Sequence, residues 1–390
     1  MKIISVVGAR PNFMKIAPFI SAINKNNLSA KQNDLKIQHI LVHTGQHYDD
    51  RMSKAFFTAL NIPDADINLG IGSGSHAEQV GYTMIAFEKV LFEEKPDWVI
   101  VLGDVNATLA CSVVAKKLHI KVCHIEAGLR SGDESMPEEI NRLVTDRLSD
   151  LLLTPDALSG KNLKKEGIPD SKISFVGNIM IDTLEANRSR ASALTIKNII
   201  KENIIENQNN NDLESFNSAT PTYALMTMHR PSNVDQKEIL EPIIRFLLNE
   251  VSKDMILIWP IHPRTQKQLN TFALWDEIVQ NKKVFLLQPI GYHEMLKLNM
   301  NAKIMLTDSG GLQEECTVLG TPCLTLRWNT ERPITLREHG GASVLVGNNI
   351  SEIKKEYLYT LQLERSPEKP ELWDGKTAER VLKSLLKASE

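Results

Sequence analysis

Short apolar runs alternate with helix-length segments along most of this chain, and this alternation limits the fold more than any other feature. Runs such as "KIISVVG" and "DWVIVLGD" are apolar on both faces, as strands are when helices cover both sides of a sheet. The same pattern recurs in "IQHILVHTG", "KVCHIEAG", "LLLTP", "ISFVGN", "TYALMTMHR", "MILIWPIHP", "VFLLQP", "KIMLTDS" and "TPCLTLR". Strands that alternate with helices of roughly 10–15 residues predict an α/β fold with parallel sheets.

The pattern breaks once, at residues 199–220, where the sequence is polar and rich in asparagine. We expect a surface insertion or linker there, because such a segment cannot bury enough apolar surface to form a core. It separates an N-terminal set of strands from a C-terminal set. We therefore predict two doubly wound, Rossmann-like domains that face each other across a cleft.

Composition and charge exclude several classes of protein. The chain has 390 residues, 42% of them hydrophobic, and a net charge of −3, so it lacks the basic excess of a nucleic-acid or anionic-membrane partner. No apolar run reaches the roughly 20 residues that span a bilayer. The N-terminus reads as a strand and not as a signal peptide. The four cysteines, Cys111, Cys123, Cys316 and Cys323, lack zinc spacing and suit free thiols in the cytoplasm.

Ligands of doubly wound sheets bind beyond the carboxyl ends of the strands, so polar residues that follow strands are the candidates for a site. In "GARPNFMK" the cations Arg10 and Lys15 lie where the first strand passes into a helix, which suits an anionic ligand. In "VLGDVNAT" the side chain of Asp104 either caps the next helix or faces the cleft.

The segment "HIEAGLRSGDESMPEEINR" places Glu126 directly after an apolar strand, where a carboxylate needs a partner, and Arg130 is a candidate. Farther on, Ser135 and Glu138 match a capping box before a helix that begins at Pro137. Glu138 and Arg142 are also spaced as i,i+4 partners. A structural and a catalytic role of Glu138 both remain open from these residues alone.

Three further segments follow strands of the C-terminal half. "MHRPSN" contains His229, which suits hydrogen bonding to a polyanion, whereas His262 in "PIHPRT" also suits a structural role. We find no metal-ligand spacing around either histidine. In "TDSGGLQEE" a small-residue turn opens a helix, and its free N–H groups favour an anion. Arg332 follows the next strand.

Together, the order and spacing of these motifs resemble the non-hydrolysing UDP-N-acetylglucosamine 2-epimerases over roughly residues 1–385. The segments that carry the resemblance are "VVGARPNFMKIAP", "HTGQHYD", "LGDVNAT", "HIEAGLRSGD", "MPEEINR", "VGN", "HRPSN", "TDSGGLQEE" and "TERP". The resemblance implies a GT-B-type fold with two domains, at residues 1–180 and 181–369. It also implies a C-terminal helix, at about residues 370–390, that returns to the first domain.

The resemblance also implies roles for individual residues. The catalytic set that it implies is Asp104, Glu126, Glu138 and His229. The substrate-binding set is Arg10, Lys15, Arg142, Ile290, Met295, Ser309, Gly310, Gly311, Glu315 and Arg332, with Glu315 on the ribose hydroxyls. Bacterial members of the family have a second, regulatory UDP-GlcNAc site, to which Gln46 and His47 would correspond.

The activity that the resemblance implies is the reversible conversion of UDP-GlcNAc to UDP-ManNAc, an isomerisation without a metal or another cofactor, in a homodimer. UDP leaves C1 to give 2-acetamidoglucal and then adds back, with a proton delivered to the other face of C2. Four alternatives remain: a 2-epimerase of UDP-2,3-diacetamido-2,3-dideoxy-glucuronic acid, a hydrolysing epimerase, a GT-B glycosyltransferase and a nucleotide-sugar sensor without activity.

Overall fold

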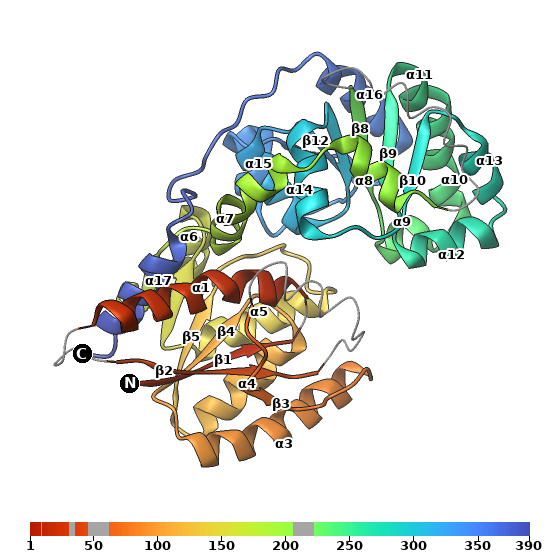
Figure 1. Ribbon diagram of the computed structural model, residues 1–390. Coiled ribbons are helices and arrows are strands. Elements are labelled where there is room, and N and C mark those ends of the chain that lie inside the picture. Colours follow the sequence, from red (N-terminus) through yellow and green to blue (C-terminus); the bar gives the residue numbers. More distant parts are fainter. Residues whose placement is uncertain (9, 31–35, 46–61, 206–221) are drawn as a thin grey trace. The chain divides into compact units, whose positions relative to one another are not determined.

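The computed structural model describes residues 1–8, 10–30, 36–45, 62–205 and 222–390 (Figure 1). These residues form two compact units. The first contains Met1–Ala186 and Glu371–Glu390, and the second contains Asn187–Pro370. Within the described ranges, no helix combines the length and the apolar composition that crossing a lipid bilayer requires.

The first unit is built on a seven-stranded parallel sheet with the order β3-β2-β1-β4-β5-β6-β7. The strand order reverses between β1 and β4, so the chain leaves these two neighbouring strands toward opposite sides of the sheet. The strands are β1 (Lys2–Val7), β2 (Gln38–His43), β3 (Ile67–Asn68), β4 (Trp98–Leu102), β5 (Lys121–Ile125), β6 (Leu151–Thr154) and β7 (Ile173–Phe175).

Helices cover both faces of this sheet, which explains why its strands are apolar throughout. Ile4 and Val6 of β1 pack in one core with Phe87 and Cys111, which come from the helices on one face. Helices α1 and α17 pack together on the other face (Figure 1). The helices of the unit are α1 (Arg10–Ser29), α3 (His76–Glu94), α4 (Asn106–Lys117), α5 (Pro137–Leu148), α6 (Ala157–Lys165), η1 (Asp170–Lys172), α7 (Ile179–Ala193), which runs into the second unit, and α17 (Thr377–Lys387).

The C-terminal segment completes the first unit. Asp182 of α7 accepts hydrogen bonds from the backbone N–H groups of Thr377 (3.0 Å) and Ala378 (2.7 Å), which are the first residues of α17. Trp373 is 1% exposed and donates its indole N–H to the carbonyl of Pro155 at 2.9 Å. Residues almost two hundred positions apart in sequence are therefore joined in one core.

The second unit contains a six-stranded parallel sheet with the order β10-β9-β8-β11-β12-β13. Its order reverses between β8 and β11. The strands are β8 (Tyr223–Thr227), β9 (Ile256–Pro260), β10 (Val284–Leu287), β11 (Ile304–Thr307), β12 (Cys323–Thr325) and β13 (Ser343–Leu345). The helices are α8 (Ile196–Asn203), α9 (Pro231–Val234), α10 (Lys237–Phe246), η3 (Leu247–Val251), α11 (Ser252–Asp254), α12 (Pro263–Thr271), α13 (Trp275–Gln280), α14 (Tyr292–Asn301), α15 (Gly310–Leu319), η4 (Pro333–Thr335), η5 (Arg337–His339) and α16 (Ile350–Leu361).

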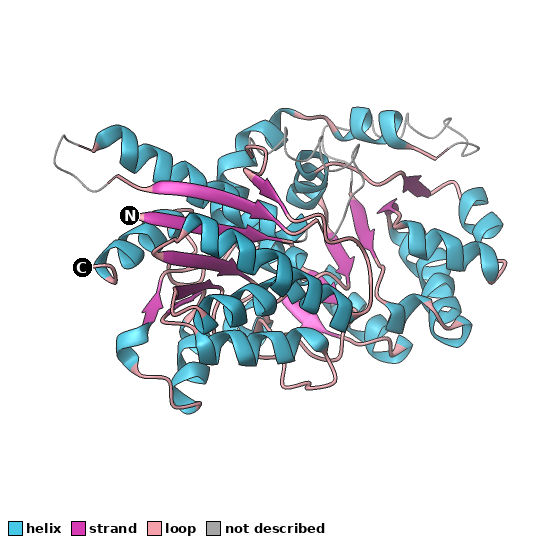
Figure 2. Cartoon of the chain, turned by 90° about the horizontal axis from the view of Figure 1, so that it is seen from below, coloured by secondary structure: helices cyan, strands magenta, loops and turns pink. Residues whose placement is uncertain are grey.

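Alternate residues of β8 enter two different cores, as the period of two in a strand requires. Ala224 and Met226 belong to the core on one face of the sheet. Tyr223 and Leu225 belong to the core on the other face, with residues of α8, α14 and α15. In Figure 2 the helices of each unit (cyan) flank its strands (magenta).

The α/β prediction is confirmed, and all the apolar runs quoted above form strands of the two parallel sheets. Strands β3 and β13 were not predicted, because one apolar residue in β3 (Ile67) and two in β13 (Val344 and Leu345) are too few to form an apolar run. The predicted insertion is wrong for residues 199–205. Ile199 and Ile200 of α8 are buried, and Ile205 donates its backbone N–H to Leu286 of β10 at 3.0 Å. Residues 206–221 lie outside the described residues.

Candidate active site

Polar and charged side chains gather where the strand order of each sheet reverses, beyond the carboxyl ends of the strands. In the first unit these side chains follow β1, β4 and β5, and in the second they follow β8, β9 and β11. Loops at such a reversal diverge to opposite faces of the sheet, which opens a crevice for a ligand. The residues that the sequence singled out are thus placed in two groups, one in each unit.

Lys15 and Glu126 form a buried ion pair in the first unit. Their side chains are 7% and 2% exposed, and Lys15 Nζ contacts Glu126 Oε2. Lys15 comes from the second turn of α1, and Glu126 immediately follows β5. Glu126 has a φ of 72°, a left-handed conformation that costs energy for any residue other than glycine. The carboxylate is therefore held in place by a strained turn and a buried cation.

Gly103, at the end of β4, allows this pair to form. A Cβ atom at this position would lie 3.2 Å from Lys15 Nζ and 3.4 Å from Glu126 Oε2, and the φ of 64° also favours glycine. The next residue, Asp104, does not cap helix α4, whose N-cap is Val105 without a side-chain bond. Its carboxylate instead pairs with Arg142 Nη1.

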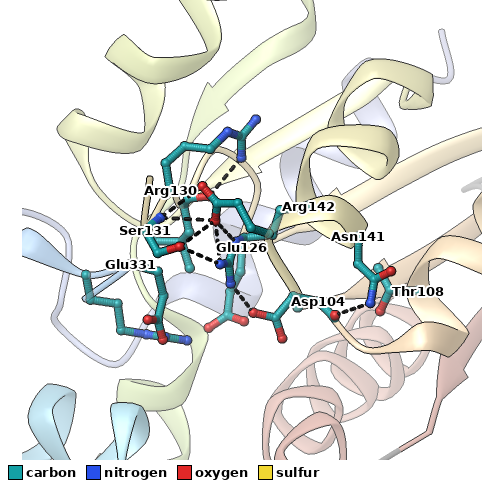
Figure 3. A network of polar contacts seen from close by, with 12 residues as sticks. Asp104, Thr108, Glu126, Arg130, Ser131, Asn141, Arg142 and Glu331 are labelled. Atoms are coloured by element: carbon teal, nitrogen blue, oxygen red, sulfur yellow. Dashed lines mark hydrogen bonds and ion pairs between the residues drawn. The ribbon is translucent and has the colours of Figure 1, made fainter. Parts of the chain in front are cut away.

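Arg142 of α5 lies between two carboxylates (Figure 3). It is 2% exposed, and in addition to its pair with Asp104 it donates from Nε to Glu139 Oε2 at 3.0 Å. Glu139 also accepts the backbone N–H groups of Ser131 and Gly132 at 3.0 Å each. Burial raises the pKa of Glu139, but the N–H of Ser131 and the charge of Arg142 outweigh it and hold this pKa below its ordinary value.

Two predictions about this helix are wrong. The partner of Arg142 is Glu139, at i,i+3, and not Glu138. The capping box is also absent, because the N-cap is Met136 and the hydroxyl of Ser135 bonds Asp133 at 2.5 Å. Pro137 does begin the helix, as predicted. Glu138 is exposed in the first turn of the helix.

Arg130 does not pair with Glu126, contrary to expectation. Its guanidinium contacts Asp146 Oδ2 at 2.7 Å and Glu166 Oε2 at 2.7 Å. Asp146 is 1% exposed and also contacts His124 Nδ1 at 2.6 Å. A second buried polar cluster therefore lies behind the turn that carries Glu126.

In the second unit Asp308 holds the segment that carries His229. Asp308 follows β11, is fully buried, and accepts the backbone N–H groups of His229 (2.9 Å) and Arg230 (2.8 Å). Its other oxygen lies 2.9 Å from His229 Nδ1. Burial raises the pKa of Asp308, but the contacts with His229 outweigh it and keep this pKa below its ordinary value. The ring of His229 is 43% exposed, so Nε2 can meet a ligand.

Helix α15 begins with Gly310, and Ser309 is its N-cap without a side-chain bond to the helix. The first N–H groups of the helix lack acceptors within it, so this terminus suits an anion. At Gly310 an added Cβ would lie 3.0 Å from Glu331 Oε1 and 3.2 Å from Arg332 Nη1, whereas at Gly311 it would meet nothing within 4 Å. Gly310 thus allows a charged cluster to approach the helix terminus.

This cluster is made of two arginines and two glutamates, all buried. Arg332 contacts Glu331 and donates from Nε to Glu314 Oε1 at 2.7 Å. Arg327 pairs with Glu331 at 2.8 Å. Although burial raises the pKa of Glu331, the two arginine charges bring it well below the ordinary value. Glu314 therefore faces the other side chains of this cluster.

Glu315 behaves differently from Glu314. It is 3% exposed, and burial raises the pKa of its carboxyl to about 7, while the polar groups of Tyr292 and Asn299 beside it offset only part of that rise. Ile290 and Met295 pack at the edge of the same core. An aromatic, two partly buried apolar residues and a carboxylate thus lie near the start of α15.

Three of the predicted residues cannot be placed as side chains. Arg10 is the first residue of α1, but its side chain lies outside the described part, and so do Gln46 and His47. Among the described residues, no three histidine, cysteine or acidic side chains are grouped to hold a metal ion. All four cysteines are buried free thiols, as predicted.

Sequence reasoning missed Glu139, Asp308 and Glu331. Glu139 had a signal, since i,i+3 spacing to Arg142 is as favourable as i,i+4. Asp308 also had a signal, because it directly follows a buried strand, just as Glu126 does. Glu331 had no signal, because only the tertiary structure brings its loop to the first turn of α15.

The sequence profile of the UDP-N-acetylglucosamine 2-epimerase family matches residues 29–386. The UDP-N-acetylglucosamine 2-epimerase of Methanocaldococcus jannaschii is 43% identical over 388 residues, with 99% of each chain covered. Its crystal structure in complex with UDP-GlcNAc and UDP has a TM-score of 0.83 and covers 99% of this chain and 100% of that one. The UDP-2,3-diacetamido-2,3-dideoxy-D-glucuronate 2-epimerase of Pseudomonas aeruginosa is 37% identical over 352 residues, 89% of this chain and 88% of that protein.

A lipopolysaccharide outer core galactosyltransferase, at 15% identity and a TM-score of 0.50 over 100% of this chain and 99% of its own, shares the GT-B-like fold alone. The profile match and the full-length identities go beyond a shared fold, and they show that this chain belongs to the UDP-N-acetylglucosamine 2-epimerase family.

Proposed function

We propose that this protein is an isomerase that interconverts UDP-GlcNAc and UDP-ManNAc. The observation that carries the proposal is the 43% identity, over 99% of both chains, to the M. jannaschii UDP-N-acetylglucosamine 2-epimerase. The charged groups beyond the strands of both sheets support it, because they provide what this reaction needs: carboxylates for proton transfer, and cations and N–H groups for a leaving diphosphate.

The reaction proceeds by elimination and re-addition. The hydrogen at C2 is not adjacent to a carbonyl, so it becomes acidic only as the C1–O bond to the β-phosphate breaks. A base takes the C2 proton, the C2–H electrons form the C1=C2 bond of 2-acetamidoglucal, and UDP leaves with the electrons of the C1–O bond. Return of UDP to C1 and of a proton to the opposite face of C2 gives the epimer.

The first unit supplies the proton transfers in this proposal. Glu126 beside Lys15 and Asp104 beside Arg142 are carboxylates held by buried cations, and Glu138 is the exposed carboxylate in the first turn of α5. A base and an acid on opposite faces of the sugar require more than one carboxyl group. Arg10 and Lys15 meet the sugar-diphosphate.

The second unit holds the nucleotide. Ser309, Gly310 and Gly311 offer small side chains and N–H groups to the diphosphate, and His229 and Arg332 add positive charge where negative charge accumulates. Glu315 accepts the ribose hydroxyls, and Ile290 and Met295 contact the uracil.

The reaction is tested by incubating the protein with UDP-GlcNAc in D₂O and following C2 by NMR. We expect UDP-ManNAc to accumulate with deuterium at C2, because the proton taken from C2 exchanges with solvent before its return. Free ManNAc would instead indicate hydrolysis. No turnover of UDP-GlcNAc would contradict the proposal.

The carboxylate assignment is tested with Glu126→Gln. We expect kcat to fall by roughly 10²–10⁴-fold, the usual contribution of a general acid or base, while UDP binding by calorimetry stays the same. Glu134→Gln is the control, since Glu134 is an exposed glutamate of the same segment. Full activity of Glu126→Gln would remove Glu126 from the proton transfers.

A second candidate substrate is UDP-2,3-diacetamido-2,3-dideoxy-glucuronic acid. The P. aeruginosa relative named for it is 37% identical over 89% of this chain. Both substrates share UDP and the C2 centre, so the same carboxylates serve either one. Comparing kcat/KM for the two sugars decides between them, and we expect UDP-GlcNAc to be preferred.

A homodimer is the quaternary structure that we propose, with α3 as the contact. Tyr82, Ile85 and Phe92 are about 60% exposed along one side of this helix. Two antiparallel copies of α3 that place Glu78 of each beside Lys89 of the other would also place Tyr82 of each beside Ile85 of the other, a self-complementary arrangement.

The mass of the full chain measured by light scattering tests this contact. We expect a dimer that Ile85→Glu converts to a monomer, because a buried unpaired charge opposes association. Leu358→Glu, at an exposed apolar residue of α16, is the control and should remain dimeric. A monomeric wild-type protein would contradict the proposal.

A cytoplasmic location is also proposed and is supported by the buried free thiols.

A further inference from the structure

His124 lies in the interior of the first sheet, and neither the proposed reaction nor substrate binding uses it. It is the fourth residue of β5 and is 0% exposed. Its Nδ1 lies 2.6 Å from Asp146 Oδ1, and its Nε2 lies 2.8 Å from the carbonyl oxygen of Gly103. Each ring nitrogen therefore faces an oxygen.

Both oxygens act as acceptors. The carbonyl oxygen of Gly103 has no proton to donate. Asp146 is ionised, because its contacts with His124 and Arg130 outweigh burial and keep its pKa below the ordinary value. His124 is therefore held at both ring nitrogens, by the carboxylate of Asp146 on one side and by the backbone of Gly103 on the other.

The atoms that this ring contacts belong to the turns that carry two proposed catalytic carboxylates. Gly103 directly precedes Asp104, and its left-handed turn packs against Lys15 and Glu126. Asp146 Oδ2 accepts the backbone N–H of Gly128 at 3.0 Å, two residues after Glu126. One histidine–carboxylate pair thus links the ends of β4 and β5.

Arg130 and Glu166 extend the contacts around this pair. Arg130 contacts Asp146 at 2.7 Å and Glu166 at 2.7 Å, so a chain of polar contacts runs from His124 through Asp146 and Arg130 to Glu166 at the surface. On the other side, Lys15 and Glu126 form their ion pair beside Gly103. The carboxylate that holds His124 is therefore itself held by the guanidinium of Arg130.

We propose that His124 is a positioning residue that, through Asp146 and the backbone of Gly103, fixes the relative position of the Asp104 and Glu126 turns. Its effect on rate rests on the proposed epimerase activity, whereas its hold on the backbone does not. The side chain itself does not touch the substrate.

The positioning role is tested with His124→Gln. We expect kcat to fall roughly 10²-fold with KM changed less than about threefold, as for a displacement of catalytic groups of about 1 Å. Amide hydrogen exchange should accelerate at Gly128, a readout that does not depend on activity. His39→Gln is the matched control, a half-buried histidine of the same sheet whose ring contacts Ser5 at 2.9 Å, and it should change neither quantity.

If His124→Gln does not fold, Asp146→Asn gives the same test, because it keeps the size of the side chain and removes the charge. Unchanged kcat together with unchanged exchange at Gly128 in a folded variant would overturn the proposal. Absence of epimerase activity in the wild-type protein would instead contradict the proposed function, and the exchange measurement at Gly128 would still decide the role of His124.

Discussion

Glu126 and Glu315 are both buried glutamates, but their surroundings favour different protonation states. Glu126 contacts the ammonium group of Lys15, which favours the carboxylate. Glu315 lies beside Tyr292, Asn299 and the carboxyl group of Glu314, and burial raises its pKa to about 7. The ionisation of a buried glutamate therefore depends on the groups beside it and not on the residue type alone.

The raised pKa of Glu315 predicts a specific pH dependence of stability. Between its ordinary pKa of 4.5 and about 7, the folded chain binds this proton more tightly than the unfolded chain does. The free energy of unfolding therefore falls as pH rises through this window, by about 3 kcal/mol in total. Glu315→Gln is neutral throughout, so its stability relative to wild type should increase by that amount from pH 4.5 to 8.

Urea unfolding of both proteins across this pH range measures the difference. Glu364→Gln is the control, because Glu364 is an exposed glutamate of the same unit and its neutralisation should leave the pH profile unchanged. A constant difference between wild type and Glu315→Gln would show that Glu315 ionises normally.

At the scale of single elements, helix α5 depends on one arginine. Arg142→Ala leaves the carboxylates of Glu139 and Asp104 without their shared cation, and Glu139 is buried. Breaking such a pair costs about 3–5 kcal/mol. We expect a loss of this size in the free energy of unfolding measured in urea.

Arg147→Ala is the matched control for Arg142. Arg147 is in the last turn of the same helix but is exposed, so its removal should change the free energy of unfolding by less than about 0.5 kcal/mol. Equal effects of the two substitutions would show that general helix stability, and not the buried ion pairs, accounts for the role of Arg142.

Helix α15 offers a similar comparison between two neighbouring glycines. Gly310→Ala forces a methyl group to 3.0 Å from Glu331 Oε1, and we expect a loss of about 1–2 kcal/mol. Gly311→Ala has open space and gains helix propensity, so we expect no loss of stability. Thermal unfolding of the two variants tests this, and a lower Tm for Gly311→Ala than for Gly310→Ala would contradict the packing argument.

At the scale of the whole molecule, the last residues of the chain complete the first core. Trp373, Val381 and Leu385 are at most 1% exposed, and each buried side chain of this kind contributes about 1.5–3 kcal/mol. Deletion of Glu371–Glu390 should therefore remove at least about 5 kcal/mol from the first unit, a large part of the stability of a typical domain.

Hydrogen exchange measures where this stability is lost. We expect protection to fall in β1 and α1, which belong to the unit that contains the deleted segment, and to persist in β8 and β11. Deletion of the exposed Glu390 alone is the control. Unchanged protection in β1 would show that the first unit does not need its C-terminal segment.

The sequence alone was sufficient for most of the strands, since a run such as "DWVIVLGD" is apolar on both faces only in a strand that helices cover on both sides. It also predicted that Lys15, Asp104, Glu126 and His229 follow strands, because in parallel sheets those positions lie at one edge. It failed at Ile199 and Ile200, where two buried residues in a polar segment form too weak a signal.

The tertiary structure decided which charges meet. Glu126 pairs with Lys15 from 111 residues away and not with nearby Arg130, and Arg142 binds Glu139 and Asp104 and not Glu138. Sequence spacing reports only neighbours along one element, whereas these pairs form across strands and loops that the sheet order brings together. The sequence thus determined the elements and their family, and only the fold assigned each buried charge to its partner, because a buried charge is stable only where packing delivers an opposite one.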